Sequence, residues 1–439
     1  MASAREAAML TLAACERQGA WSDGCLKRVL REQRLDRRDA ALATRLCFGV
    51  QQNKLLLDWH LTPFCRGGLK KLDVNVLCNL RLAVYQFLFL DKIPPSAAVN
   101  EAVTLTRTHC RNPRAAGMVN AVLRAMLRQK QFPEPDCADK VETLSITYSH
   151  PRWLVEAFQA ELGADVEPLL KSDNQRPPTT VQVNTLRTNT EQLLRDLRDE
   201  GAEAEPHPWL PNCLLLTGTG NLEQSDAFRA GNFYVQDAAA RLAVEAAGLR
   251  PGARVLDCCA APGGKSFAAG IAMQNQGEII SCDIHPHKIK LLEAGRDRLG
   301  LSILKPCLQD SAQFRTEWLD GFDVVLTDVP CSGLGIIRKK PDIRYKNPEL
   351  LNGLPQVQQR ILANCAQYVR PGGVLVYSTC TLLHRENEDV VNRFLRENPP
   401  FALEEFELPH FGIQPGAVTF WPHIHGTDGF FVAKLRRKG

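Results

Sequence analysis

Two cysteines, Cys331 and Cys380, each follow closely on an apolar run that is typical of a buried strand. Cys331 lies in the run D-V-P-C-S-G, which begins at Asp328, and Cys380 lies in S-T-C-T. A buried cysteine usually acts only as a small hydrophobic side chain. Two cysteines in loops at strand ends, one of them beside an aspartate and a proline, instead indicate reactive thiols. The sequence therefore predicts thiol chemistry at the carboxyl ends of two strands.

A glycine-rich turn joins an expected strand to an expected helix within the segment Arg254–Ser266 (RVLDCCAAPGGKS). Small residues let a ligand approach the backbone, and the start of a helix offers free N–H groups. The segment matches neither the phosphate loop nor the dinucleotide fingerprint, so phosphate cradling is not the favoured use.

Two aspartates follow the next expected strands along the chain. Asp283 is suited to accept hydrogen bonds from a ribose diol, and Asp310 could accept one from an adenine amino group. Each aspartate alone could equally be a helix N-cap. Together with the glycine-rich turn they predict a pocket for an adenosine group.

The runs D-C-C-A-A-P-G-G-K, D-V-P-C-S-G and S-T-C-T together resemble the Sun/Fmu (RsmB-like) family of RNA (cytosine-5) methyltransferases, above all its bacterial 16S ribosomal RNA members. Val329 stands where the family usually has alanine, and Thr381 where it usually has serine. The resemblance extends over nearly the whole chain, through Gly49–Gln52, Lys92–Pro95, Val119–Arg124, Asn174–Pro178, Val235–Asp237 and Asp428–Phe431.

This resemblance implies a cofactor and a role for each thiol. The cofactor is S-adenosyl-L-methionine, and Cys380 is the nucleophile with Cys331 as its helper. The implied cofactor contacts are Cys259, Ala260, Ala261, Pro262, Gly263, Gly264, Lys265, Asp283, Asp310 and Asp328.

The chemistry explains why two thiols are useful, because carbon 5 of cytosine is a weak nucleophile. Addition of the Cys380 thiolate to carbon 6 makes carbon 5 an enamine carbon, and Asp328 would stabilise that adduct at nitrogen 3. Cys331 would then remove the carbon 5 proton, so that 5-methylcytosine is released. The base must be in a loop or flipped out to be reached. Arg338, Lys339 and Lys340 could hold its phosphates, and the alternative is a solvated loop.

Strands and helices alternate from Asp237 onward, which is typical of a parallel doubly wound sheet with ligands at the carboxyl ends of its strands. The strands are expected at 254–259, 278–283, 323–328 and 373–379, and the helices after Gly264 and over 288–299 and 356–368.

The preceding half of the chain divides into two further regions. Apolar residues recur at helical spacing over residues 2–130, and residues 131–145 have the prolines and acidic residues of a linker. Helices are then expected over 151–170 and 191–200, with strands at 179–184 and 213–217. Combined with the resemblance, the chain is expected to contain an all-α NusB-like domain (1–135), a small α+β domain (146–235) and an α/β Rossmann-like methyltransferase domain (236–439).

Charge is distributed unevenly along the 439 residues, although the formal net charge is only +4. Basic residues outnumber acidic ones over residues 1–130, and the reverse holds for the rest of the chain. A basic domain favours a polyanionic partner such as RNA, and the alternative is a solvated surface without a partner. The basic residues form two groups, one of Lys27, Arg28, Arg31, Arg34, Arg37 and Arg38 and one of Arg107, Arg111, Arg114, Arg124 and Arg128.

Composition indicates an ordinary globular protein, with 44% apolar and 23% charged residues. The 15 cysteines are scattered, contain no C-x-x-C pair and accompany no signal-like segment over residues 1–20, so we expect a cytoplasmic protein without a structural metal. No apolar run reaches the ~20 residues that span a bilayer. A monomer is the default expectation.

Three alternatives stay open from the sequence. A DNA-type enzyme would use Cys331 as the nucleophile, although the basic helical domain and the second cysteine argue against it. The same chemistry on transfer RNA is the second alternative. The third is a non-catalytic RNA-binding ribosome assembly factor that kept the fold.

Overall fold

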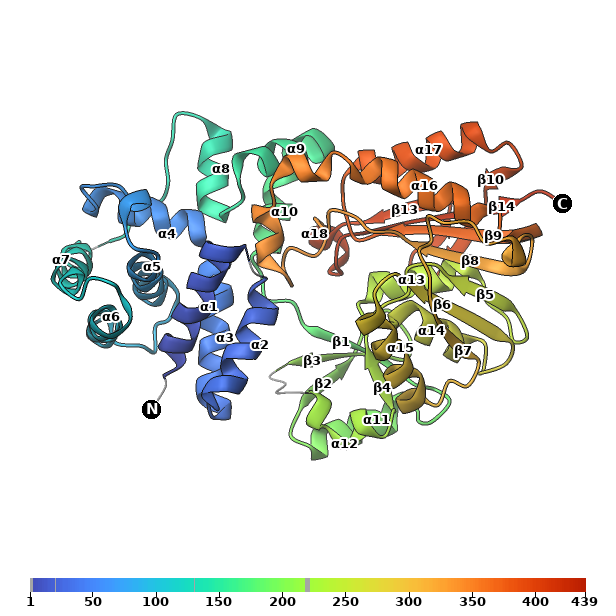
Figure 1. The fold of residues 1–439 in the computed structure, drawn as a ribbon, viewed down its shortest axis with the longest axis horizontal. Helices are drawn as coiled ribbons and strands as arrows, with labels where there is room; N and C mark the ends of the chain where they lie inside the picture. Colours follow the sequence, from blue (N-terminus) through green and yellow to red (C-terminus); the bar gives the residue numbers. More distant parts are fainter. Residues whose placement is uncertain (1–2, 20, 130, 218–221) are drawn as a thin grey trace. The chain divides into compact units, whose positions relative to one another are not determined.

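The computed structural model of the protein describes residues 3–19, 21–129, 131–217 and 222–439. The expected domains 1–135 and 146–235 thus include a few residues, 1–2, 20, 130 and 218–221, that lie outside the described ones. The chain forms two compact units (Figure 1). The helical unit contains Met1–Asn174 and Lys339–Lys346, and the sheet unit contains Gln175–Arg338 and Asn347–Gly439.

The helical unit confirms the expected all-α start of the chain. Its apolar helix α5 is buried over most of its length and packs against α1, α3, α4, α6 and α7. Caps bound α1 at both ends, since Ser3 Oγ accepts from the N–H of Glu6 and Gly19 ends the helix in the left-handed conformation. The helices are α1 (Ala4–Gln18), α2 (Ser22–Gln33), α3 (Arg37–Gln52), α4 (Lys54–Leu61), α5 (Val74–Phe89), α6 (Pro95–His109) and α7 (Ala115–Leu127).

Three more helices complete this unit, namely α8 (Lys140–Tyr148), α9 (Arg152–Leu162) and α10 (Val166–Asp173). The expected linker over 131–145 is wrong from Lys140 onward. Asp139 caps α8 by accepting from the N–H of Val141 at 2.9 Å, so the acidic residue that suggested a linker starts a helix. The expected helix over 151–170 is broken at Gly163, which has a φ of 58°.

The segment Lys339–Lys346 belongs to the helical unit although it is distant from it in sequence. It contains the short 3-10 helix η6 (Pro341–Tyr345), in which the side chain of Arg344 is fully buried. The guanidinium of Arg344 donates to the carbonyls of Gln52 at 2.9 Å and Tyr148 at 3.2 Å, and to Asn174 Oδ1 at 3.0 Å. Arg344 therefore links α3 to the ends of α8 and α10.

A four-stranded antiparallel sheet, in the order β2-β3-β1-β4, opens the sheet unit. The expected strands over 179–184 and 213–217 and the helix over 191–200 are confirmed. The elements are β1 (Thr179–Val183), α11 (Thr190–Asp199), β2 (Glu203–Pro206), β3 (Cys213–Thr217), α12 (Asp226–Arg229) and β4 (Phe233–Val235).

The main sheet has the order β10-β14-β9-β8-β5-β6-β7, with β13 beside β14. Strands β9, β8, β5, β6 and β7 are parallel, as expected, whereas β14 runs antiparallel to β9, so the sheet is mixed. The strands are β5 (Arg254–Asp257), β6 (Glu278–Asp283), β7 (Leu304–Leu308), β8 (Phe322–Asp328), β9 (Val369–Thr379), β10 (Phe401–Leu403), β13 (Ala417–Phe420) and β14 (Phe430–Arg437). A separate hairpin pairs β11 (Phe406–Leu408) with β12 (Gly412–Gln414), and α18 (Pro422–His425) follows β13.

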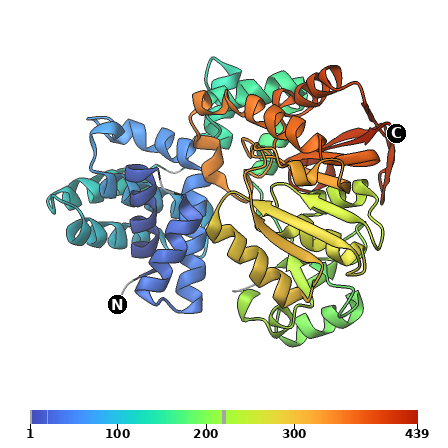
Figure 2. The ribbon, with the colours of Figure 1, turned by 45° about the vertical axis from the view of Figure 1, so that its right-hand side comes forward.

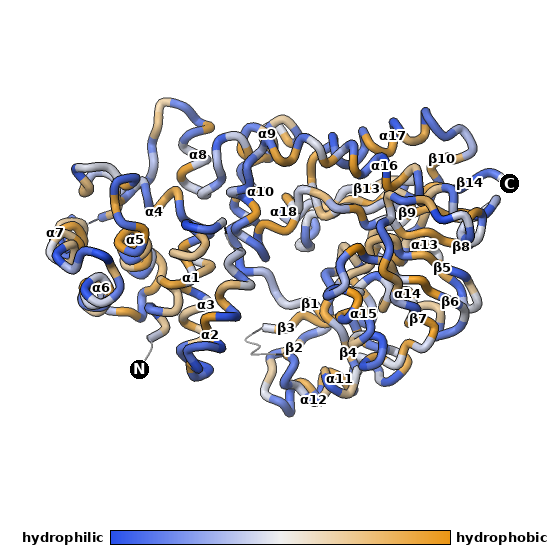
Figure 3. The backbone as a smooth tube through the Cα atoms, viewed as in Figure 1, coloured by the Kyte–Doolittle hydropathy of each residue, from blue (hydrophilic) through white to orange (hydrophobic). Residues whose placement is uncertain are grey.

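Helices cover both faces of this sheet (Figures 1 and 2). Val324 and Leu326 of β8 pack with α13 and α14, while Val325 between them packs with α16 and α17. This alternation buries both faces of the strand, which explains the three successive apolar residues at its centre (Figure 3). The helices are α13 (Ala238–Ala247), α14 (Gly264–Ala272) and α15 (Pro286–Leu299) on one face, and α16 (Leu354–Ala366) and α17 (Glu388–Glu397) on the other.

Within the described parts of the chain, no helix is both long enough and apolar enough to cross a membrane.

Candidate active site

The glycine-rich turn lies between β5 and α14, at the carboxyl edge of the sheet. Its backbone is fixed to both neighbouring strands, because the N–H of Cys258 donates to Leu326 O of β8 at 2.9 Å and that of Ala260 to Cys282 O of β6 at 2.7 Å. Gly263 has a φ of 120°, and a Cβ there would lie 2.2 Å from the ring of Phe267. No side chain caps the N-terminus of α14. The first N–H groups of α14 therefore have no side-chain cap.

Asp257, the last residue of β5, stabilises this turn through a hydrogen bond to Ser266. The sequence did not identify this residue. Its carboxylate is fully buried and accepts from Ser266 Oγ at 2.7 Å, and Ser266 is in turn 2.7 Å from Ser281 Oγ. Burial raises the pKa of Asp257 to about 6. The network fixes the first turn of α14 against β6.

The two aspartates expected to bind adenosine lie at the ends of β6 and just after β7. Asp283 is buried, and its carboxylate accepts from the N–H of His285 at 2.9 Å and from Lys288 Nζ at 3.4 Å. Asp310 is exposed and accepts from the N–H of Ala312 at 2.9 Å. Both therefore make local turn contacts, and each carboxylate has further acceptor capacity.

Asp328 ends β8, and both of its oxygens have partners. Oδ1 accepts from Ser378 Oγ of β9 at 2.9 Å, and Oδ2 forms an ion pair with Lys265 Nζ at 2.7 Å. The ammonium of Lys265 also lies 4.9 Å from the ring centroid of Phe430. Lys265 thus connects the glycine-rich turn to Asp328, a link that spacing alone does not reveal.

The two cysteines meet beside Asp328, with 3.3 Å between Cys331 Sγ and Cys380 Sγ. Both side chains are partly exposed. The hydrogen bond with Cys380, followed by burial, raises the pKa of Cys331 well above its ordinary value. Cys331 therefore holds its proton more tightly than an ordinary cysteine does.

The loops that carry the two thiols are also joined to each other. Ser332 Oγ lies 2.7 Å from Thr381 Oγ1, and the N–H of Gly335 donates to the carbonyl of Cys380 at 2.9 Å. Both hydroxyls are buried. The separation of the sulfurs is therefore set by the loops as well as by the strands.

The expectation that Arg338 holds RNA phosphates is wrong. Its side chain is only 7% exposed and binds Asp428 Oδ1 at 3.1 Å, with Asp237 Oδ2 at 3.9 Å. The next residue, Lys339, already belongs to the helical unit. Arg338 therefore closes the end of the Cys331 loop instead of facing a ligand.

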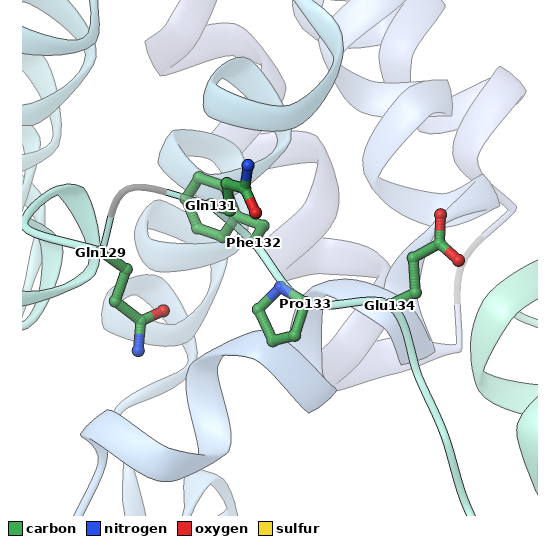
Figure 4. Close-up of a pocket in the computed structure, with 5 residues that line it drawn as sticks. All are labelled: Gln129, Gln131, Phe132, Pro133 and Glu134. Carbon is green, nitrogen blue, oxygen red and sulfur yellow. The ribbon is translucent and has the colours of Figure 1, made fainter.

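The helical unit contains a surface hollow (Figure 4). It is lined by Gln129, Gln131, Phe132, Pro133 and Glu134. This lining includes no thiol and no cationic side chain, so the hollow offers neither a nucleophile nor a cation for a phosphate.

Three family models match successive parts of the chain. The NusB family matches residues 2–128, an RsmF/B-like ferredoxin-like domain matches residues 150–223, and the model described as 16S rRNA methyltransferase RsmB/F matches residues 246–436. The last match contains the glycine-rich turn and both cysteines.

Whole-chain relatives agree with these models. The probable ribosomal RNA small subunit methyltransferase B of Bacillus subtilis is 35% identical over 446 residues, which cover 100% of this chain and 99% of that protein. The ribosomal RNA small subunit methyltransferase B of Salmonella arizonae is 30% identical, over 93% of this chain and 92% of that one. The crystal structure of PH0851 matches 99% of this chain and 98% of its own, with a TM-score of 0.83 and 28% identity.

The fold, with its NusB-like, ferredoxin-like and Rossmann-like parts, confirms the architecture expected from the resemblance. The chain belongs to the RsmB/F family of 16S rRNA methyltransferases.

Proposed function

We propose that the protein transfers a methyl group from S-adenosyl-L-methionine to carbon 5 of a cytosine in 16S ribosomal RNA, through a covalent adduct with Cys380. The observation that carries this proposal is the 3.3 Å separation of the Cys331 and Cys380 sulfurs beside Asp328. The target RNA is inferred from the names of the relatives, which are small subunit ribosomal RNA methyltransferases.

Each of the two thiols has a distinct step in this reaction. The Cys380 thiolate adds to carbon 6 of the base. The electron pair moved to carbon 5 would form the new bond to the methyl group as the bond between that methyl group and the cofactor sulfur breaks, which leaves S-adenosylhomocysteine. When Cys380 bonds to carbon 6, the Cys331 thiol gives its own proton to solvent. The resulting Cys331 thiolate then takes the proton from carbon 5, and the carbon–sulfur bond to Cys380 breaks as the double bond reforms. The raised pKa of Cys331 suits this role, because its thiolate is the stronger base.

Asp328 orients the base in this proposal. Its side chain is 29% exposed, and Ser378 and Lys265 already hold its carboxylate in place. A hydrogen bond from the protonated nitrogen 3 of the adduct to this carboxylate would stabilise the charge that develops on the ring. The nearby Lys265 prevents the carboxylate from turning away.

The cofactor supplies the methyl group and would be held by the glycine-rich turn Cys259–Lys265 with Asp283, Asp310 and Asp328. Three features support a fit. The N-terminus of α14 is uncapped, Asp283 presents a buried carboxylate, and Ile284 beside it is 55% exposed and offers apolar surface for a purine.

The helical unit is proposed to bind the RNA backbone. All of the basic residues in the two groups identified from the sequence are exposed. Arg31, Arg34, Arg37 and Arg38 form no ion pair among the described residues, so their charges are open to phosphates.

The test is a denaturing gel of protein incubated with cofactor and 16S ribosomal RNA. Replacing Cys331 by serine removes the base that releases the product, so a protein–RNA band should survive denaturation. Replacing Cys380 by serine should abolish both methylation and the band, because a hydroxyl forms almost no alkoxide at neutral pH, and the double variant should give no band. Cofactor affinity of Cys380→Ser should stay near that of wild type.

Each alternative gives a different pattern. If Cys331 were the nucleophile, the band would be absent from Cys331→Ser and present in Cys380→Ser. A non-catalytic assembly factor would give no band and no methyl transfer in any lane. Bisulfite sequencing of RNA from cells without the gene decides the substrate, since loss of a 5-methylcytosine from transfer RNA alone would contradict the ribosomal assignment.

A further inference from the structure

A buried acid, Glu386, lies behind the two cysteine loops and has no place in the reaction described above. It ends the short 3-10 helix η8 (His384–Glu386), and its exposed fraction is 0%. Among the ion pairs that the described residues form, none involves Glu386. Burying a carboxylate without a nearby cation costs free energy unless hydrogen bonds stabilise the group. The hydrogen bonds of Glu386 therefore identify the segments that it stabilises.

These hydrogen bonds reach the residue after each catalytic cysteine. Oε2 accepts from the N–H of Ser332, which follows Cys331, at 2.8 Å. Oε1 lies 3.5 Å from the hydroxyl of Thr381, which follows Cys380. One carboxylate therefore contacts both thiol loops.

A glutamine completes the arrangement on the side of α16. The amide of Gln358 donates to Glu386 Oε2 at 2.9 Å and to the carbonyl of Pro330 at 3.1 Å. Gln358 is itself buried. The Cys331 loop is thus held at Pro330 and at Ser332, on both sides of the thiol.

The next residue fixes the other loop in the same way. Asn387 Oδ1 accepts from Thr379 Oγ1 at 2.6 Å, and Asn387 Nδ2 donates to the carbonyl of Thr381 at 3.1 Å. The hydroxyl of Tyr377 donates to the carbonyl of Glu386 at 2.5 Å. The turn that bears Glu386 is therefore anchored to β9 and cannot move independently of Cys380.

We propose that Glu386 is a positioning residue that holds the Cys331 thiol against Cys380, so that proton removal from carbon 5 follows methyl transfer without delay. The inference rests on the proposed function, because it assigns Glu386 to the step that Cys331 performs. The charge of Glu386 also adds to the causes that raise the pKa of Cys331, behind the Cys380 hydrogen bond and burial. Its main contribution is geometric, since errors of about 1 Å in a reacting group can cost on the order of a hundredfold in rate.

The experiment compares Glu386→Ala, Glu386→Gln and Cys331→Ser in the full-length protein with cofactor and 16S ribosomal RNA. Glu386→Ala should lower kcat about tenfold or more and leave RNA attached to the protein on a denaturing gel, as Cys331→Ser does. Glu386→Gln should keep activity within about threefold of wild type, because its amide oxygen can accept from Ser332 and Gln358 and its nitrogen can donate to Thr381.

Glu404→Ala serves as the matched control. Glu404 is also a carboxylate of the sheet unit, but its partners are Lys434 and Arg436 on β14, away from the thiols. This variant should show no attached RNA. Comparison of Glu404→Ala with Glu386→Ala thereby separates the general effect of losing a paired carboxylate from the specific effect of losing the contacts around the cysteines.

The outcomes separate the two claims. If Cys331→Ser itself traps no RNA, the proposed function fails. If Cys331→Ser traps RNA but Glu386→Ala does not, and its activity falls only with the folded fraction, the role of Glu386 is overturned. Equal impairment of Glu386→Gln and Glu386→Ala would also overturn it.

A second variant keeps the test decisive if Glu386→Ala does not fold. Gln358→Met removes the amide that holds both Glu386 and Pro330 while keeping a side chain of similar length. More attached RNA than in wild type supports the inference. Wild-type turnover without attached RNA contradicts it.

Discussion

Cys331 Sγ and Cys380 Sγ lie 3.3 Å apart although 49 residues separate them in the chain. Their closeness follows from the register of two parallel strands, in which Asp328 at the end of β8 is opposite Ser378 of β9. Each cysteine comes two or three residues after that pair, so the two loops leave the sheet together. Neighbouring parallel strands thereby bring together two thiols that sequence distance keeps apart.

This closeness predicts sensitivity to peroxide. One hydrogen peroxide molecule can oxidise the two thiols to a disulfide with release of two waters, and the sulfurs need only approach from 3.3 Å to about 2.05 Å. Methyl transfer should be lost on treatment and recovered with dithiothreitol. Mass spectrometry should find the Cys331 and Cys380 peptides linked. Inactivation without that link would contradict the prediction.

Asp257 predicts a pH dependence of stability. Its folded pKa of about 6 lies above the ordinary value of 3.8, so the folded protein binds this proton more tightly than the unfolded chain does. The resulting stabilisation is complete below about pH 3.8 and is lost as the pH rises through about 6. Relative to Asp257→Asn, which does not titrate, wild type should lose about 3 kcal/mol of unfolding free energy across this window. Urea unfolding of both proteins at several pH values measures the difference, and a pH-independent difference would refute the shift.

Arg344 is predicted to stabilise the helical unit. Arg344→Met leaves the carbonyls of Gln52 and Tyr148 without this donor in a buried region, which should cost about 2–4 kcal/mol. Hydrogen–deuterium exchange should accelerate at the ends of α3 and α8. Arg107→Met, at an exposed position of α6, should change stability by less than about 0.5 kcal/mol. Similar exchange in both variants would show that Arg344 is dispensable.

The exposed arginines around the α2–α3 junction predict a change in salt dependence. Replacing Arg31, Arg34, Arg37 and Arg38 by glutamine should weaken RNA binding and flatten the slope of log K against log salt by about 0.7–0.9 for each lost phosphate contact. Filter binding at several salt concentrations measures this slope. Arg195→Gln, on an exposed face of α11, is the control and should leave it unchanged. A slope like that of wild type in the quadruple variant would mean that this surface has no RNA partner.

The strand ends could be predicted from the sequence because apolar runs of the parallel strands are local signals. The convergence of Asp328, Cys331 and Cys380 followed from the general rule that parallel strands end at one edge. The antiparallel strand β14 could not be predicted, because its pairing with β9 depends on contacts between distant segments.

Glu386 was missed for a related reason. It lies in the run His384–Glu388, whose polar and charged residues are typical of a solvated turn, and only the fold buries it. The ion pair between Lys265 and Asp328 likewise joins residues from separate strand ends. Arg338 shows the opposite error, since a basic cluster suggested a phosphate site but the structure gives Arg338 two acidic neighbours.

The membership of Lys339–Lys346 in the helical unit has a consequence for synthesis on the ribosome. The helices of residues 4–173 are synthesised first. The carbonyls of Gln52 and Tyr148 have no hydrogen bond from Arg344 until the intervening residues 175–338 have also been translated. At about 5–20 residues per second this delay is on the order of ten seconds or more. The nascent helical unit therefore spends that time without the buried guanidinium of Arg344, and it gains this donor only after half of the strands of the main sheet, β5 to β8, have been translated.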